Sequence, residues 1–335
     1  MASSWSSSSL SSWSPRSSTF SVSSSSFSSL PPKFKLPAKP RHSAFHVSAP
    51  SLTSLSRSPA SDRILVSGRR GLMSTATLPL LLQLREFIEG SFPETAAELN
   101  ENYLTIIKEE IRKVVSKGKA AGMLRLVFHD AGTYEMYENS GGMNGSIVYE
   151  LDRPENAGLK KSLKVLEKAK TEVDAKQQVS WADMIAVAGA EAISICGGPT
   201  IPVTLGRLDS LDPDSPGRLP QESLDASALK QCFQMKGLST QELVTLSGAH
   251  TLGGKGFGNP NVFDNSYYKI LLEKPWSSAA GMSSMIGLPS DRALAEDNEC
   301  LRWIKAYADD QNLFFKDFKD AYIKLVNSGA KWRSP

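Results

Sequence analysis

Only two histidines, His129 and His250, lie beyond residue 70 of this 335-residue chain. His129 stands in the run LRLVFHDAGT, where Arg125 precedes it by four residues. On a helix this spacing places both side chains on one face, about 6 Å apart. A base beside a fixed cation suits cleavage of an O–O bond, because the base moves a proton between the oxygens while the cation stabilises the developing negative charge. The alternative is that Arg-x-x-x-His is ordinary helix structure.

His250 stands in the run LSGAHTLG and suits a different task. A single neutral imidazole is the usual protein ligand of a five-coordinate haem iron, and its other N–H then needs a carboxylate partner. Asp291, in the run PSDR, is the candidate for that partner. The alternative is a core or capping histidine near a helix end.

Other metal and phosphate chemistry lacks its residues. Two histidines far apart, with no His-x-x-x-His run, do not suit a zinc or di-iron site. Three cysteines without a Cys-x-x-Cys spacing argue against a zinc site and against a disulfide framework. The GKGFG run at 254–258 lacks the spacing of a phosphate-binding loop, so a tight turn is expected there.

The charge pattern divides the chain. Residues 1–70 are rich in serine and contain nine Lys or Arg but one acidic residue, Asp62, which is typical of a chloroplast transit peptide. The rest has 29 basic and 34 acidic side chains, so it carries about −5 although the whole chain carries +3. A body without a basic stripe is not expected to bind nucleic acid.

Residues 71–96 form either a linker that ends a single transit peptide or a second signal. Arg69 and Arg70 precede an apolar stretch at 72–84, as in a twin-arginine signal for the thylakoid lumen. That stretch is too short to span a bilayer, so no transmembrane anchor is expected. We favour the single transit peptide, and therefore the chloroplast stroma over the lumen.

Helical spacing of apolar residues dominates the body, 97–335, and indicates an all-α domain. Gly118 is expected to end the first helix, and a helix carrying His250 is expected to end at Gly253. Lysines on the segment 159–173 are expected to form a solvated face. The predicted helices cover 97–117, 121–131, 159–173, 181–196, 240–253, 298–309 and 312–328, with a long loop at 199–220.

The two histidine runs, together with LGRLD at 205–209, PGRLP at 216–220 and PNVFDNSYY at 260–268, resemble the plant and microbial intracellular haem peroxidases. Within the ascorbate peroxidase superfamily, the chain is most similar to the chloroplast ascorbate peroxidase-related group. The resemblance covers about 100–331. It implies a two-lobed, all-α haem peroxidase fold with haem b between a distal and a proximal helix.

The resemblance also implies roles for individual residues. His129 matches the distal acid–base catalyst, Arg125 the distal stabiliser of the transition state, and Asn156 the residue that orients His129. His250 matches the axial ligand of the haem iron, and Asp291 its hydrogen-bond acceptor.

Two further features follow from the resemblance. Phe128 stands where typical ascorbate peroxidases have a distal tryptophan, and it keeps an aromatic wall beside the haem. A potassium site is also implied, because hard oxygen ligands suit such a cation. Its matching residues are Thr251, Asn259, Val262 and Asp264.

The segment between His250 and Asn259 departs from the family pattern. It is shorter than usual and lacks both the arginine that helps to bind ascorbate and the proximal tryptophan. Lys117 matches the lysine that assists ascorbate, but a single exposed cation contributes little. We therefore expect hydrogen peroxide and a small-molecule electron donor as partners, with ascorbate either weak or replaced by a phenolic reductant. The alternative function is an inactive peroxidase-fold structural or binding protein.

Overall fold

The computed structural model describes residues 96–277 and 286–334. The expected transit peptide at 1–70 and residues 71–95 lie outside this range. The chain divides into two units, 1–74 and 75–335, and all the described residues belong to the second unit. In that part of the chain the regular elements are helices, and β-pairing is limited to two isolated bridges. The prediction of an all-α body is therefore confirmed. None of the described helices is long and apolar enough to cross a membrane.

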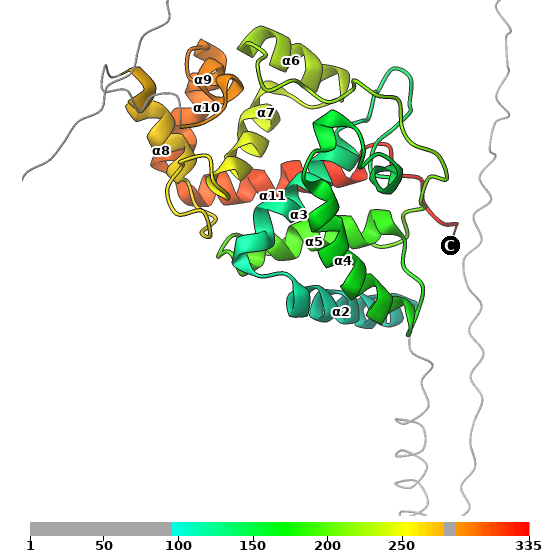
Figure 1. Ribbon diagram of the computed structural model, residues 1–335. Helices are drawn as coiled ribbons and strands as arrows, with labels where there is room; N and C mark the ends of the chain where they lie inside the picture. The colour runs from blue at the N-terminus through cyan, green and yellow to red at the C-terminus, as the bar shows by residue number, and fades with distance from the viewer. Residues whose placement is uncertain (1–95, 278–285, 335) are drawn as a thin grey trace, which may run out of the picture. The chain divides into compact units, whose positions relative to one another are not determined.

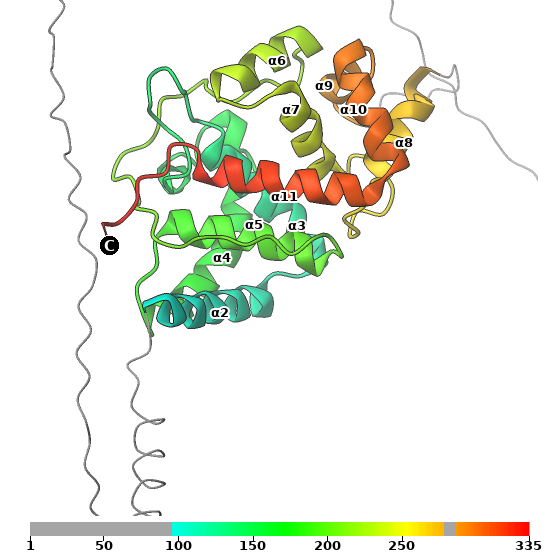
Figure 2. The same cartoon turned by 180° about the vertical axis from the view of Figure 1, so that it is seen from behind.

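The helices form two groups that share α11 (Figures 1 and 2). The first group consists of α2, α3, α4 and α5, with its most extensive contacts between α3 and α5, and the second contains α6 to α10. Helix α11 packs against both α3 and α7. The bounds are α2 Ala96–Val114, α3 Lys117–Ala131, α4 Leu159–Asp174, α5 Trp181–Ile195, α6 Ala226–Met235, α7 Thr240–Ser247, α8 Ser266–Glu273, α9 Pro289–Leu294, α10 Asn298–Asp309 and α11 Gln311–Asn327. Short 3-10 helices are η1 Ser146–Tyr149, η2 Pro154–Asn156, η3 Gly248–Thr251 and η4 Pro275–Ser277.

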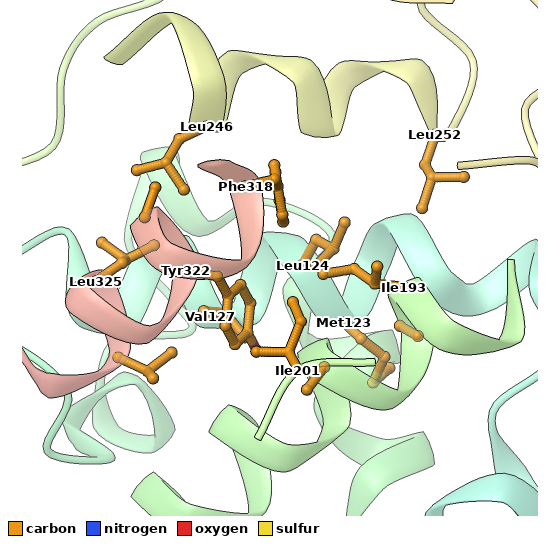
Figure 3. Close-up of a cluster of buried hydrophobic side chains, with 14 of the residues drawn as sticks. Met123, Leu124, Val127, Ile193, Ile201, Leu246, Leu252, Phe318, Tyr322 and Leu325 are labelled. Atoms are coloured by element: carbon orange, nitrogen blue, oxygen red, sulfur yellow. The ribbon is translucent and has the colours of Figure 1, made fainter. Parts of the chain in front are cut away.

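The core lies where the two groups meet. Helix α5 is buried on all sides over most of its length, as its nearly continuous apolar sequence requires. Figure 3 shows side chains of α3, α5, α7 and α11 gathered in one apolar cluster, which Leu252 joins from just beyond η3. The same cluster includes Leu124 and Val127, which lie on α3 beside the two candidate catalytic residues. Packing therefore holds the helix that carries His129 rigidly against its neighbours.

Side-chain caps set the start of several helices. Ser239 and Glu242 form a reciprocal capping box at the start of α7. Asp225, Asp297 and Asp310 accept hydrogen bonds from the first free backbone N–H groups of α6, α10 and α11. The predicted bounds of 298–309 for α10 agree with the structure because a strong cap marks its first residue.

Some predicted boundaries were wrong. The break between α2 and α3 falls at Val115 and Ser116, and Gly118 lies in the first turn of α3 without the left-handed backbone that ends helices. Helix α7 ends at Ser247, so His250 lies on a 3-10 turn rather than on an α-helix. Helices α6, α8 and α9 were not predicted, because segments of six to ten residues offer too few turns for a clear period.

The LGRLD run is structural. The Arg207 guanidinium is fully buried and donates to the Asp183 carboxylate at 2.9 Å. It also donates to the Val326 carbonyl at 2.8 Å, and it stacks on the Trp332 ring at 4.7 Å. A buried guanidinium needs such partners to offset its desolvation. Arg207 thus ties α5 to the end of α11.

Candidate active site

The distal pair joins α3 to η2. The Nδ1 atom of His129 lies 2.7 Å from Oδ1 of Asn156. Nδ2 of Asn156 donates to the Glu150 carbonyl at 2.9 Å, which fixes the orientation of the amide. Because the amide oxygen can only accept, Nδ1 of His129 carries the proton and Nε2 is left as the free base.

Asp130 anchors the loop that brings Asn156 to His129. Its fully buried carboxylate accepts backbone N–H groups from Asn144, Gly145 and Ile147 at 2.8 to 3.2 Å. Asp130, which directly follows His129, therefore fixes the backbone of residues 144–147 against α3. Asp130 was not among the predicted site residues, although an acidic residue on an otherwise apolar stretch indicates a carboxylate that needs partners when buried.

The electrostatics of the distal side favour a neutral base. Burial lowers the pKa of His129, and the positive charge of Arg125 acts in the same direction, while the hydrogen bond to Asn156 opposes them. The net shift is downward from the usual value of 6.5. His129 is therefore neutral at pH 7 and able to accept a proton.

Arg125 and Phe128 border this base. Nη1 of Arg125 donates to the Ala157 carbonyl at 3.4 Å, one residue beyond Asn156, and the side chain is exposed. The Phe128 ring stacks on Phe233 of α6 at a centroid distance of 6.2 Å and meets the His129 ring edge-on at 6.3 Å. Phe128 therefore forms an aromatic wall between His129 and α6.

The proximal pair joins η3 to α9. Nδ1 of His250 lies 2.8 Å from Oδ1 of Asp291. The same carboxylate accepts the Tyr267 hydroxyl at 2.9 Å and, on Oδ2, the Leu288 backbone N–H at 2.8 Å. The Asp291 side chain is 2% exposed, whereas 39% of the His250 side chain is exposed. Nδ1 of the imidazole is thus fixed by a carboxylate that also accepts two other hydrogen bonds, and the Nε2 edge of the ring faces away from this carboxylate.

The partner of the proximal histidine is an anion, whereas the partner of the distal histidine is a neutral amide. Burial would lower the pKa of His250, but the charge of Asp291 and its hydrogen bond outweigh burial and raise it. Burial would likewise raise the pKa of Asp291, but His250, together with the other donors, holds it below its usual range. Asp291 is therefore a carboxylate at neutral pH.

The two imidazoles lie on neighbouring elements, as a haem held between them requires. Helix α3 contacts η3, and a Cβ added to Gly253 would lie 3.2 Å from Cβ of Ala121. The negative charge of the exposed Glu222 acts to raise the pKa of both histidines. Among the described residues, neither histidine has a hydrogen-bond partner for Nε2. His250 is the candidate to hold the iron, because its carboxylate partner makes it a strong donor.

The expected potassium residues are only partly brought together. The Thr251 hydroxyl donates to Oδ1 of Asp264 at 3.0 Å, and that oxygen also accepts the Ser266 N–H. Asn259 is exposed and bonds locally, its side chain to the Asn261 N–H and its carbonyl to the Val262 N–H. Thr251 and Asp264 therefore meet, while Asn259 and Val262 lie in the neighbouring turn.

The glycine-rich run forms the expected turn. Gly256 and Gly258 adopt positive φ angles of 85° and 86°. Phe257 between them is buried and packs on the Tyr267 ring at 4.6 Å. The shortened segment thus places a phenylalanine, which has no hydrogen-bond donor, beside the Tyr267–Asp291–His250 contacts.

The described part of the chain also holds other residues of the types that bind metals or form disulfides. It contains no group of three or more His, Cys, Asp or Glu side chains suited to a metal ion. Cys196, Cys232 and Cys300 are all free thiols.

Comparison with known proteins agrees with this geometry. Residues 106–310 match the family model described as Peroxidase. The chain is 60% identical over 310 residues to "Putative L-ascorbate peroxidase 6" of Arabidopsis thaliana, which covers 90% of this chain and 91% of that protein. It is 38% identical to L-ascorbate peroxidase 5, peroxisomal, of the same plant, covering 70% and 86% of the two chains. It is 34% identical to the cytosolic L-ascorbate peroxidase 2 of that plant, covering 72% and 98%. The chain therefore belongs to the peroxidase family, as a haem peroxidase similar to L-ascorbate peroxidases.

Proposed function

We propose that this enzyme reduces hydrogen peroxide to water with electrons from a small-molecule donor. The observation that carries the proposal is the neutral His129 with a free Nε2, one helical turn from the Arg125 guanidinium. Nε2 takes a proton from one peroxide oxygen and delivers it to the other, and Arg125 stabilises the charge that develops as the O–O bond stretches. A bound haem would supply the redox-active iron, with His250 as its protein ligand.

A rival function is an inactive peroxidase-fold protein, which the shortened proximal segment suggests. The arrangement of His129, Asn156 and Arg125 argues against it, because Asn156 holds His129 as a neutral base one helical turn from an exposed guanidinium, and a scaffold has no need of that arrangement. Purified protein reconstituted with haemin should show a Soret band that His250→Ala removes, and it should consume peroxide. A well-folded protein that stays colourless would favour the scaffold.

We infer that the donor is a phenolic or another reductant rather than ascorbate, or that ascorbate is used only weakly. The support is the short turn between His250 and Asn259, which leaves Lys117 exposed at the start of α3 without the arginine expected beside it by resemblance. Steady-state rates with ascorbate and guaiacol measured side by side test this point. Fast, saturable turnover of ascorbate would contradict it.

We also propose a potassium ion near Thr251 and Asp264, since hydroxyl and carboxylate oxygens are hard ligands. Adding potassium to protein dialysed into a tetramethylammonium buffer should raise the melting temperature, and Asp264→Asn should abolish the rise. An equal response in that variant would remove the proposed site.

We propose the chloroplast stroma as the site of action, on the composition of residues 1–70. Residues 1–70 fused to a fluorescent protein should enter isolated chloroplasts and remain outside the thylakoids. A fusion of residues 1–96 tests the rival lumenal signal. If that signal operates, this fusion enters the thylakoid lumen, and the double replacement of Arg69→Lys and Arg70→Lys blocks the transfer. Import into peroxisomes, or no import at all, would contradict the proposal.

A further inference from the structure

An unbroken series of aromatic rings leads away from the proximal histidine. The Tyr267 ring meets the His250 ring edge-on at a centroid distance of 6.0 Å. Tyr267 contacts Tyr268 at 5.0 Å, and Tyr268 contacts Tyr307 of α10 at 5.2 Å. Tyr307 stacks against Trp303, one turn earlier on α10, at 6.1 Å. Single electrons pass readily between rings in such contact.

Two members of this series have a carboxylate to receive a proton. The Tyr267 hydroxyl donates to Asp291 at 2.9 Å, and the Tyr307 hydroxyl donates to Asp317 at 2.9 Å. A phenol that loses an electron becomes a strong acid, so a hydrogen-bonded carboxylate lets it release its proton and recover it when the electron returns. Tyr268 donates only to the backbone carbonyls of Val244 and Thr245, and it therefore serves as the bridging ring.

The series ends at the surface. Tyr267, Tyr268 and Tyr307 are buried, whereas Trp303 is partly exposed. The Arg302 guanidinium lies 5.0 Å from the Trp303 ring. A cation beside an oxidisable ring favours a donor that carries negative charge.

We propose that Trp303 is a second oxidation site, where anionic aromatic reductants too large to approach the haem give up electrons. This inference rests on the proposed peroxidase function, which supplies hydrogen peroxide as the oxidant. Peroxide takes up two electrons and two protons and becomes two waters. Two phenol groups at the surface each lose one electron and one proton and become phenoxyl radicals. Each electron passes from Trp303 through the tyrosines toward the haem side, so Trp303 returns to its starting state.

The test uses the haem-loaded protein with two donors. Free guaiacol reaches the haem directly, whereas tyramine coupled to carboxymethyl dextran is anionic and too large to enter. Trp303→Phe should lose most of the peroxide-dependent oxidation of the dextran-bound phenol and keep the guaiacol rate. Trp303→Tyr keeps an oxidisable ring and should restore part of the loss. Tyr307→Phe, which removes the hydroxyl bonded to Asp317, should resemble Trp303→Phe.

Trp332→Phe is the matched control, because that ring is 41% exposed, also stacks on an arginine and lies outside the series. It should leave both rates unchanged. A nitroso spin trap added with peroxide should label Trp303 and not Trp332, as read by peptide mass spectrometry. Equal dextran-phenol rates in wild type and Trp303→Phe, with guaiacol oxidation intact, would overturn the second site alone. Loss of guaiacol oxidation in the wild type would instead overturn the proposed peroxidase function.

Discussion

The two histidines differ chiefly in what holds Nδ1. An amide oxygen, Oδ1 of Asn156, holds His129, and a carboxylate oxygen, Oδ1 of Asp291, holds His250 at nearly the same distance, 2.7 against 2.8 Å. The pKa of His129 is lowered and that of His250 is raised. One side-chain type therefore acquires opposite properties, because a neutral partner cannot offset the cost of burying a charge and an anion can.

That difference suits two tasks. A base that must take a proton at neutral pH has to be uncharged beforehand, which the distal side ensures. A ligand that must donate electron density to a metal gains from a negative charge behind it, which the proximal side provides. Substitutions of Asn156 or Asp291 should therefore change the pKa or the ligand strength of the histidine that each one contacts.

Removing the distal base should have the largest effect. His129→Leu should slow peroxide consumption by about 10²- to 10⁴-fold, the usual contribution of general acid–base catalysis, while the Soret band remains. Stopped-flow measurement of the reaction with peroxide checks this result. A variant that lost its haem would instead assign His129 a structural or ligand role.

Neutralising the proximal partner should have the next largest effect. Asp291→Asn should weaken haem retention or peroxide turnover by about 10- to 100-fold, the usual cost of losing a ligand's hydrogen-bond partner. Transfer of haem to apomyoglobin measures retention, and Asp291→Glu, which keeps the charge, is the comparison. Equal losses in the two variants would point to geometry rather than charge.

Making the distal partner an anion should change the pH profile. In the wild type, the rate of reaction with peroxide should fall as the pH drops through the His129 pKa, below 6.5, because protonation removes the base. Asn156→Asp places a carboxylate beside His129 and should raise that pKa by about 1 to 3 units. The acid limb should then move upward by a similar amount. An unmoved limb would mean that another group controls it.

Two neighbouring tyrosines offer the finest test. Tyr267→Phe and Tyr268→Phe each remove one buried hydroxyl, and each should lower the free energy of unfolding by about 1 kcal/mol. Only Tyr267 donates to Asp291. Loss of its hydroxyl alone should therefore make the carboxylate a stronger hydrogen-bond acceptor for His250, which makes His250 a stronger ligand and lowers the haem reduction potential. Chemical denaturation and a spectroelectrochemical titration measure the two quantities. Equal potentials in both variants would contradict the role of Tyr267.

The sequence predicted best those features that depend on residues close together in the chain. The predicted helix starts at 240 and 181 agree with α7 and α5, because a capping box at Ser239 and Glu242 and a side-chain cap at Ser180 mark them. Both signals depend on neighbours within a few residues, where backbone geometry limits the outcomes. Resemblance added the pairing of His129 with Asn156 and of His250 with Asp291, and both contacts are present.

Other parts of the site could not be predicted from sequence. Nothing in the sequence around Asp130 specified that it would collect three backbone N–H groups, or that Tyr267 would share the carboxylate with His250. The chain also continues past Ser247 as a 3-10 turn that aims His250 toward α9, where helix rules predicted an α-helix.

The residue types by themselves determined that the body is helical, that it has two imidazoles for chemistry, and that one stands a turn from an arginine. Tertiary structure brought each imidazole against its partner and therefore decided the direction in which each pKa shifts. The physical reason is that a pKa depends on burial and on the nearest charge, and here the partners come from segments 27 and 41 residues away.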